Sequence, residues 1–444
     1  MGLCETSTSS LPTGSRVLLA YSGGLDTSFL VAWLTREQGF EVTTLSIDCG
    51  GFDEAERTQM AERAMAFGAV AHETIDARGM LFDGVLRWLI AGNVRRGSTY
   101  PLCVAAERSL QAEQLAERAR DGNFDAVAHG CTGAGNDQVR FESALAVVAE
   151  GLHSLAPVRD YGFTREDEKQ WLTDQGLPIP GSGAAKYSLN QGLWGVSIGG
   201  GETLTSSGPL PEEAWLLTAR DRHVAGERAI SIEFSCGVPI ALDGRKLTPV
   251  QLIEELNHLA GRYGVGRGYH LGDTVLGIKG RIGYEAPAAE TLIEAHRELE
   301  KLVLTQAQRA TKDALADDYG RQLHAGQAFE PQLRDIEALF ASSQSRVTGT
   351  VQVLLGTGKA LVIGLESPFS MMSASGAVYG ESPDRNSNPA GALWLARTMA
   401  EPARLWRRAG ELAIEESTGG SGSLAEHTLQ PQSEEKSMEQ ESTS

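Results

Sequence analysis

Apolar and polar positions follow two different periods along the first 180 residues of the chain. Short apolar runs bounded by turn residues predict buried strands at residues 16–22, 41–51, 70–77 and 124–130. Apolar side chains at helical spacing predict helices at residues 25–39, 60–67, 82–90, 104–119 and 137–149. Strands that alternate with helices in this way indicate an α/β fold, a doubly wound parallel sheet with helices on both faces.

The pattern changes after residue 178. Gly, Ser and Pro become dense over residues 178–211, which indicates a long loop or a domain boundary. Two β-hairpins are predicted beyond it, at residues 228–244 and 348–367. Helices are predicted at residues 248–264, with Thr248 as N-cap and Pro249 at the first position, at 288–323 and at 389–414.

These patterns divide the chain into five parts. We expect a disordered lead at 1–14, the doubly wound domain at 15–180, a second α+β domain at 181–385, a helix at 386–415 and a disordered tail at 416–444. A helix that precedes a disordered tail often packs on another subunit, although packing on its own domain is an equally good interpretation.

Composition and charge exclude several classes of protein. The formal net charge of −19 argues against nucleic-acid binding, which needs a basic surface. No apolar run is long enough to span a bilayer, and the polar start lacks the core of a signal peptide. Five scattered cysteines and nine histidines without metal-ligand spacing predict neither a disulfide framework nor a resident metal site. A reducing cytoplasm fits this composition.

The strongest local signal is AYSGGLDTS, residues 20–28, at the junction of the first strand and the first helix. Gly23 and Gly24 allow a sharp turn, and the N–H groups at the helix start attract an anion. Ser22 and Thr27 add hydroxyl donors, and Asp26 can hold a phosphate-bound Mg²⁺. The loop lacks the lysine of a Walker A motif, so it predicts a phosphate site of another kind.

A second segment, GCTGAGNDQVRFE, follows the strand at 124–130. Its three glycines bring backbone close to a ligand at the carboxyl edge of the sheet. Asn136 or Asp137 is a natural N-cap, and Arg140 lies one turn further along the same helix face. A carboxylate beside a guanidinium suits a zwitterionic amino acid, whereas the simpler interpretation is a capped helix with a surface arginine.

The residues in both segments resemble one enzyme family. The loop at 20–28 is similar to the SGGxDS loop of N-type ATP pyrophosphatases. HGCTGAGNDQVRFE, residues 129–142, closely resembles a segment of argininosuccinate synthase. Three further segments are similar to that family: STYPLCVAAERSLQAEQL at 98–115, AKYSLNQGLWGVSIGG at 185–200, and GVGRG followed by GIKGRIGYEAPA at 264–288.

The resemblance implies a ligase of arginine biosynthesis that condenses citrulline with aspartate, converts ATP with Mg²⁺ into AMP and pyrophosphate, and assembles as a homotetramer. It implies no catalytic triad. Its ATP-binding residues would be Ala20, Tyr21, Ser22, Gly23, Gly24, Leu25, Asp26, Thr27, Ser28, Ile47 and Gly130. Thr132, Asn136 and Asp137 would bind aspartate. Tyr100, Asn136, Arg140, Ser188, Ser197 and Tyr284 would bind citrulline, although both tyrosines also fit buried core positions.

Three positions depart from the family pattern. The family often has Ser or Thr in place of Ala105, an acidic residue in place of Gly272 and Lys in place of Ala134. Asp273 is a candidate to compensate for Gly272. Two alternatives therefore stay open at this point: the same reaction on an N-acylated citrulline, and a non-catalytic nucleotide or amino-acid sensor on the same fold.

Overall fold

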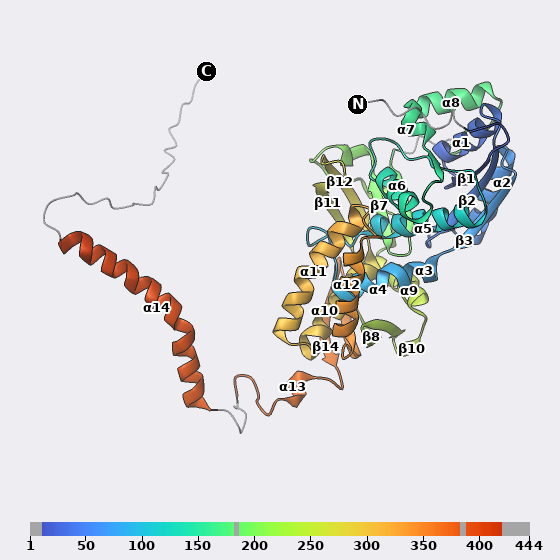
Figure 1. Cartoon of the computed structure of the whole chain (residues 1–444). Helices are drawn as coiled ribbons and strands as arrows, with labels where there is room; N and C mark the ends of the chain where they lie inside the picture. The colour runs from blue at the N-terminus through green and yellow to red at the C-terminus, as the bar shows by residue number, and fades with distance from the viewer. Residues whose placement is uncertain (1–10, 182–185, 382–387, 420–444) are drawn as a thin grey trace, which may run out of the picture. The chain divides into compact units, whose positions relative to one another are not determined.

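The computed structural model describes residues 11–181, 186–381 and 388–419. The chain divides into two units, residues 1–374 and 375–444, and Figure 1 shows the elements of each. Most of the predicted lead and tail lies outside the described residues. The predicted boundary near residue 180 falls between two elements of the first unit and stays a prediction.

A five-stranded parallel sheet forms the first part of unit 1. Its strands are β1 (Arg16–Ala20), β2 (Glu41–Asp48), β3 (Ala71–Asp76), β4 (Ala126–Ala128) and β5 (His153–Leu155). Their spatial order is β3-β2-β1-β4-β5, and every neighbouring pair is parallel. The predicted doubly wound parallel sheet is therefore confirmed.

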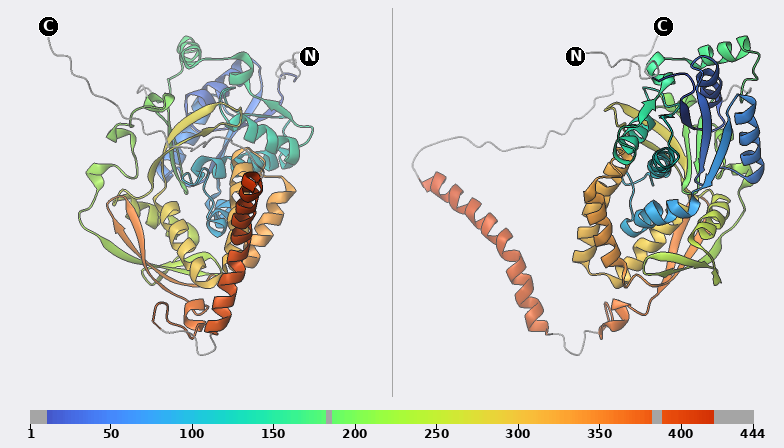
Figure 2. Two further views of the ribbon diagram at one scale, coloured as in Figure 1. Left: turned by 90° about the vertical axis from the view of Figure 1, so that its left-hand side faces the viewer. Right: turned by 45° about the vertical axis from the view of Figure 1, so that its right-hand side comes forward.

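Side chains of β1 alternate between two cores, one on each face of the sheet. Val17 and Leu19 pack into one cluster and Leu18 into the other. The first face is covered by α1 (Leu25–Arg36), α2 (Glu54–Ala66) and α8 (Arg165–Asp174), and the second by α5 (Cys103–Asp121) and α6 (Asp137–Val148). Figures 1 and 2 show helices on both sides of the sheet.

Several short elements complete this part. They are α3 (Arg78–Leu81), a π-helical turn (Phe82–Leu86), α4 (Arg87–Gly92) and α7 (Pro157–Tyr161). The sequence pattern predicted the helical stretch around residues 82–90, but β5, α7 and α8 were not predicted. β5 has only three residues, too few to show a period.

The Gly- and Ser-rich stretch was predicted to be a long loop or a domain boundary. It contains a β-hairpin, so the long-loop alternative was wrong, whereas the domain boundary stays a prediction. β6 (Ser188–Gly192) and β7 (Gly195–Gly199) pair with each other, and β7 also pairs with β12 (Lys279–Glu285). With β11 (Arg267–Asp273) they form a four-stranded sheet of order β11-β12-β7-β6. Pairing with β12, 80 residues away in the sequence, stabilises strands whose own composition favours a loop.

A second antiparallel sheet contains both predicted hairpins. Its order is β10-β9-β8-β13-β14, and its strands are β8 (Arg228–Ser235), β9 (Val238–Leu242), β10 (Arg245–Lys246), β13 (Gly349–Gly356) and β14 (Lys359–Glu366). The sequence GTGKAL, which superficially resembles a phosphate loop, forms the turn between β13 and β14.

Helices complete this part of unit 1: α9 (Pro249–Gly261), α10 (Pro287–Val303), α11 (Gln306–His324), α12 (Pro331–Gln344) and α13 (Met371–Ala374). α9 and α10 pack against the second sheet, whereas α11 and α12 pack against each other and against α4. Thr248 caps α9 as predicted. The long helix predicted at 288–323 is instead two helices, because Thr305 and Gln308 form a capping box that starts α11.

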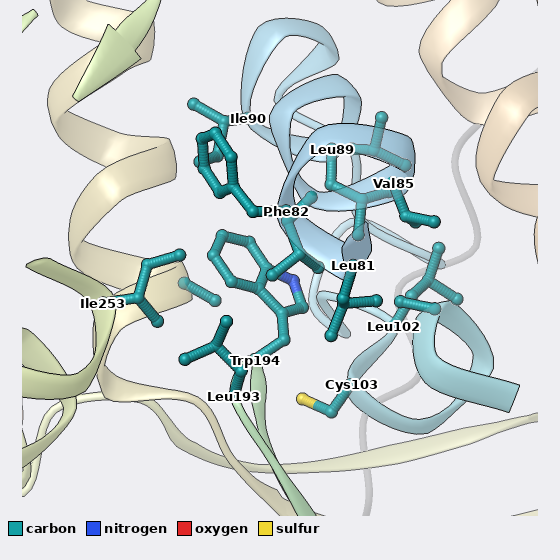
Figure 3. Packing of buried hydrophobic residues seen from close by; sticks show 14 of the residues in the cluster. Leu81, Phe82, Val85, Leu89, Ile90, Leu102, Cys103, Leu193, Trp194 and Ile253 are labelled. Atoms are coloured by element: carbon teal, nitrogen blue, oxygen red, sulfur yellow. The ribbon is translucent and has the colours of Figure 1, made fainter. Parts of the chain in front are cut away.

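Trp194, at the turn between β6 and β7, fixes this hairpin to the core. Its ring is completely buried, and its Nε1 donates a hydrogen bond to the carbonyl of Pro101 at 2.9 Å. Figure 3 shows the indole packed among side chains from the helical stretch around residue 85, from α9 and from the start of α5. The hairpin therefore cannot move without opening the core.

Unit 2 contains α14 (Pro389–Gly419), which extends past the predicted end at residue 414. Trp394, Leu405 and Trp406 expose more than half of their surface on this helix. In the described part of the chain, no helix combines the length and the apolar character needed to cross a membrane.

The capping box of α11 yields a stability prediction. Thr305 Oγ1 accepts a hydrogen bond from the Gln308 N–H at 3.2 Å, and Gln308 Oε1 accepts one from the Thr305 N–H at 3.0 Å. Thr305→Ala removes the side-chain acceptor and should lower the free energy of unfolding by about 1 kcal/mol. Urea unfolding followed by circular dichroism measures the change. Thr305→Ser keeps the acceptor and is the control; equal midpoints for both variants would contradict the prediction.

Candidate functional site

The turn after β1 carries the predicted phosphate loop. Gly23 has a φ of +72°, a left-handed conformation that glycine adopts without strain. Gly24 is the N-cap of α1, so the unpaired N–H groups of the first helical turn face the loop. Ser22 Oγ lies 3.2 Å from Thr27 Oγ1, and Ser22 and Gly24 are exposed. The loop thus presents backbone and hydroxyl donors to an anion from solvent.

The loop after β4 reaches the same place. A Cβ on Gly130 would lie 3.3 Å from Thr27 Cγ2 and 3.5 Å from Asp26 Cβ, so the two loops are in close contact. They meet because β1 pairs with β4 on one side and with β2 on the other. Ligands of doubly wound sheets bind at such a change of strand order, beyond the carboxyl ends of the strands.

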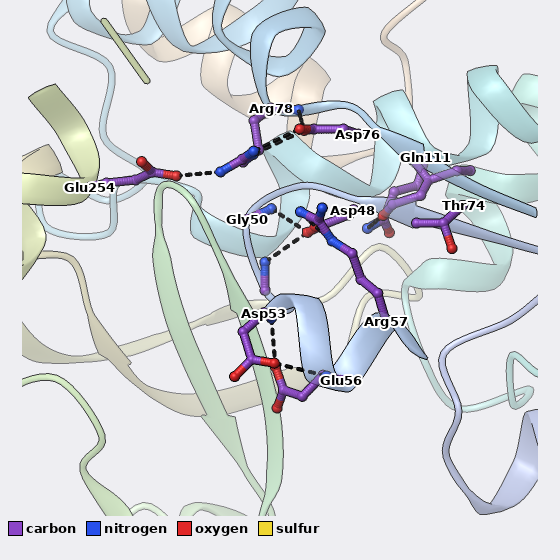
Figure 4. Close-up of polar contacts among 12 residues, drawn as sticks. Asp48, Gly50, Asp53, Glu56, Arg57, Thr74, Asp76, Arg78, Gln111 and Glu254 are labelled. Carbon is purple, nitrogen blue, oxygen red and sulfur yellow. Dashed lines mark hydrogen bonds and ion pairs between the residues drawn. The ribbon is translucent and has the colours of Figure 1, made fainter. Parts of the chain in front are cut away.

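The end of β2 is held by a buried carboxylate that the sequence analysis did not select. The Asp48 side chain is completely buried, accepts a hydrogen bond from the Gly50 N–H at 2.7 Å and forms an ion pair with Arg57, whose Nε lies 2.8 Å away (Figure 4). The carbonyl of Ile47 accepts a hydrogen bond from Gln111 Nε2 at 3.3 Å. An aspartate that directly follows an apolar strand was the available signal.

A second overlooked carboxylate lies beside the phosphate loop. Glu168 of α8 is 1% exposed and its carboxyl group lies close to that of Asp26. Burial and the neighbouring negative charge of Asp26 raise the pKa of Glu168 well above its usual value. Glu168 lies in a helix that the sequence analysis did not predict, so no sequence signal placed it here.

Asp137 lies between two guanidinium groups. Its Oδ2 accepts a hydrogen bond from Arg108 Nε at 3.0 Å, and its Oδ1 accepts one from Arg140 Nη1 at 2.7 Å. Burial alone would raise the pKa of this carboxyl, but the two positive charges outweigh it and leave the pKa below its usual value. Arg108 also donates to Asn190 Oδ1 at 2.6 Å, which links Asp137 to β6. The arginine of the YPLxxxxxR segment was the sequence signal for Arg108.

Arg140 is buried, so it is not the exposed surface arginine of the simpler interpretation. Its side chain is 4% exposed, and its Nη2 donates to the carbonyl of His324 at 2.8 Å. Asn136 precedes α6, but its side chain does not cap the helix; its Oδ1 accepts from the Val275 N–H at 2.9 Å. Thr132 is exposed in the loop before them. Asn136 therefore occupies the predicted N-cap position of α6, but its side chain binds elsewhere.

Tyr100 and Tyr284 are neighbours, with ring centroids 5.3 Å apart, and both are buried. The Tyr284 hydroxyl donates to the carbonyl of Thr99 at 2.8 Å, and the Tyr100 hydroxyl accepts from the Val104 N–H at 3.3 Å. Burial raises the pKa of Tyr284 to about 12, so its hydroxyl is a donor at neutral pH. His270 stacks on Tyr100 at 5.2 Å.

The two predicted serines lie in different environments. Ser197 of β7 is buried and its Cα lies opposite both Tyr284 and Asn190 in the sheet. Ser188, at the start of β6, is exposed and lies opposite Gly199. The structure thus brings Ser197 next to Tyr284 and to Asn190, which is bonded to the Asp137 cluster through Arg108; among the described residues, no hydrogen bond joins the Ser188 side chain to this group.

The departures from the family pattern also have a place in the structure. A Cβ on Gly272 would lie 2.6 Å from His270 Nε2, so the histidine takes up the space beside this glycine. The Asp273 carboxylate is paired with Lys279 at 2.5 Å and is exposed. Ala105 is buried, whereas Ala134 is exposed. The pairing with Lys279 engages the carboxylate that was the candidate to compensate for Gly272.

Within the described ranges, no group of three or more His, Cys, Asp or Glu side chains is arranged to hold a metal ion. His129 is buried, and its Nε2 lies 3.4 Å from Glu142 Oε1. It has a structural role behind the loop. A cation at this site would therefore take some of its ligands from a bound phosphate and only a few from the protein.

Comparison with known proteins agrees with this geometry. Residues 16–178 match the Arginosuccinate synthase N-terminal HUP domain, and residues 187–393 match the Arginosuccinate synthase C-terminal domain. Among solved structures, a predicted subunit of tRNA methyltransferase from Methanocaldococcus jannaschii has 16% identity and a TM-score of 0.26, covering 36% of this chain and 74% of its own, too slight a likeness to carry an argument.

Curated relatives cover most of the chain. The argininosuccinate synthase of Methanocaldococcus jannaschii is 40% identical over 80% of this chain and 89% of its own length. Those of Thermosynechococcus vestitus and Methanopyrus kandleri are 40% and 41% identical, over 82% and 86% of this chain and 91% and 96% of their own length. With both family domains matched and relatives aligned over nearly their whole length, this chain belongs to the argininosuccinate synthase family of enzymes.

Proposed function

We propose that this chain condenses citrulline with aspartate to form argininosuccinate, and converts ATP to AMP and pyrophosphate. The observation that carries the proposal is the contact between Gly130 and the phosphate loop. It places the segment that resembles the amino-acid site directly beside the segment that resembles the ATP site. Family membership supports the same reaction and favours neither the acylated substrate nor the sensor.

In the proposed reaction the ureido oxygen of citrulline attacks the α-phosphorus of ATP. The bond to the β-phosphate breaks, pyrophosphate leaves and citrullyl-AMP forms. The aspartate amine then attacks the ureido carbon, the bond to AMP breaks and the amine loses its proton. A ureido oxygen is a weak nucleophile, so orientation of the reactants, worth about 7–11 kcal/mol at best, must supply much of the rate.

We propose that residues 20–28, the backbone at Ile47 and Gly130 hold ATP. The N–H groups at the N-terminus of α1 and the Ser22 and Thr27 hydroxyls would donate hydrogen bonds to the phosphates. Asp26 is partly exposed there and forms no ion pair among the described residues, which suits a phosphate-bound Mg²⁺. When bound, Mg²⁺ neutralises the charge of the leaving pyrophosphate.

We propose that Thr132, Asn136 and Asp137 hold aspartate. Asp137 already accepts one hydrogen bond on each oxygen from an arginine, and a carboxylate has about four lone-pair sites, so an ammonium group can still be added. For citrulline we propose Tyr100, Asn136, Arg140, Ser188, Ser197 and Tyr284. The contacts around Ser197 and Tyr284 support this set most directly.

We further propose that the chain acts in the cytoplasm as a homotetramer. The four cysteines among the described residues are unpaired, as expected in a reducing compartment. The apolar side chains that α14 exposes support assembly, since exposed tryptophans are unusual outside an interface. Sedimentation velocity on the full chain tests the assembly, and a monomer at micromolar concentration would contradict it.

Pyrophosphate release tests the function. Purified protein with Mg-ATP, citrulline and aspartate should release pyrophosphate and form argininosuccinate. Omission of citrulline should abolish release, because no nucleophile then reaches the α-phosphorus. Omission of aspartate should abolish argininosuccinate. ATP binding without release under any of these conditions would overturn the proposal and favour the sensor.

A pair of variants tests the division of the site. Thr132→Ala should raise the KM for aspartate about 10-fold, the equivalent of one lost hydrogen bond of about 1.4 kcal/mol. It should leave citrulline-dependent exchange of pyrophosphate into ATP, measured without aspartate, within 2-fold of the wild type. Ser197→Ala should raise the KM for citrulline in that exchange about 10-fold. Equal effects of both variants on both substrates would contradict the division.

A further inference from the structure

The carboxyl groups of Asp26 and Glu168 lie close together where α1 packs against α8. Three residues further along each helix, Phe29 and Trp171 form an edge-to-face contact with ring centroids 5.4 Å apart. This contact holds the two helices together one turn beyond the carboxyl groups. The approach of Glu168 to Asp26 is therefore built into the packing of the fold.

No arginine, lysine or histidine of the described residues forms an ion pair with this carboxyl pair; the charge of Arg165 on α8 lowers the pKa of Glu168 but does not outweigh its burial. Glu168 is 1% exposed, and its Oε2 is buried without a hydrogen-bond partner. The buried carboxylate of Asp48, by contrast, has Arg57 and the N–H of Gly50 as donors. A buried acid beside another acid, with no donor, is incomplete without a cation or a proton.

The open position lies beside the phosphate loop. Asp26 is in the first turn of α1, next to Thr27, and Gly130 approaches both residues. A small divalent cation such as Mg²⁺ is usually held by one or two carboxylates together with phosphate oxygens and water, not by a closed cage of protein ligands. Two carboxylates next to a phosphate loop match that requirement.

We propose that Glu168 acts with Asp26 to hold the divalent cation that accompanies the pyrophosphate part of ATP. The inference rests on the proposed function, because it takes ATP as the source of the phosphates. It adds a residue that no motif identifies: Glu168 comes from α8, 142 residues after Asp26 in the sequence. A proton shared between the two carboxyl groups is the alternative, and the experiment below distinguishes them.

The experiment measures how strongly a divalent cation tightens ATP binding to the full chain. The dissociation constant of ATP is determined by calorimetry with excess Mn²⁺ and again in EDTA, without citrulline or aspartate. The ratio of the two constants is the coupling between cation and nucleotide. Glu168→Gln keeps the size and a hydrogen-bonding group but removes the charge. The matched control is Glu166→Gln, an exposed glutamate on the same helix.

Glu168→Gln should reduce the coupling ratio by 10-fold or more, as loss of a residue that supports a metal ion commonly does, and should leave the constant in EDTA within 2-fold. Glu166→Gln should match the wild type. Asp26→Asn should cause a similar loss, and the double variant should lose little more than either single variant, because both residues serve one cation. Circular dichroism confirms that each variant is folded.

An unchanged ratio in folded Glu168→Gln would overturn the inference and leave the shared proton as the role of this residue. A wild-type protein that binds ATP neither with Mn²⁺ nor in EDTA would instead overturn the proposed function. The two failures are therefore distinguishable.

Discussion

The carboxylate of Asp137 joins parts of the chain that are far apart in the sequence. Arg108 reaches it from α5 and Arg140 from the next turn of α6, and Arg108 extends the connection to Asn190 on β6. Arg140 continues it to the carbonyl of His324 at the end of α11. Because Arg140 is almost completely buried, its charge must be neutralised within the protein, and Asp137 is the group that does so. The cluster thereby links α5, α6, β6 and α11 around the proposed amino-acid site.

The nucleotide side depends on topology more than on any single contact. β1 lies in the middle of the parallel sheet, with β2 on one side and β4 on the other. The chain leaves β1 and β4 at the same edge, so the loops that follow these strands must meet there. The loop after β4 then continues directly to Asn136 and Asp137. One short segment therefore contacts the phosphate loop and carries residues of the proposed amino-acid site, which suits a reaction that joins an amino acid to a phosphorus atom.

The β6–β7 hairpin couples the two sides. Its Leu193 N–H donates to the carbonyl of Cys49, just after β2, at 2.7 Å. A Cβ on Gly51 would lie 2.3 Å from the Gln191 carbonyl oxygen, and one on Gly192 would overlap Glu107 Oε1. Only glycine permits such close packing of backbone. The hairpin that carries Ser197 is thereby fixed against the end of β2, so the proposed citrulline and ATP sites share one rigid frame.

The sequence by itself determined the parallel sheet, the phosphate loop and the family. These features depend on local patterns: an apolar run, a glycine pair before a helix, and the segment HGCTGAGNDQVRFE. The sequence also contained the break at Thr305, because the capping box is formed by Thr305 and Gln308, only three residues apart. The apolar period alone predicted one continuous helix.

Tertiary structure decided what local patterns do not contain. β6 and β7 have a loop-like composition and become strands because β12 pairs with β7. Asn136 has the sequence of an N-cap, but its side chain bonds to Val275 in another hairpin. Glu168 on α8 lies close to Asp26, and His324 on α11 accepts a hydrogen bond from Arg140. These residues are so far apart in the sequence that no local pattern predicts their contact. Strand pairing and side-chain partners are set by which surfaces the whole fold buries together, and that information is not local to any segment of the chain.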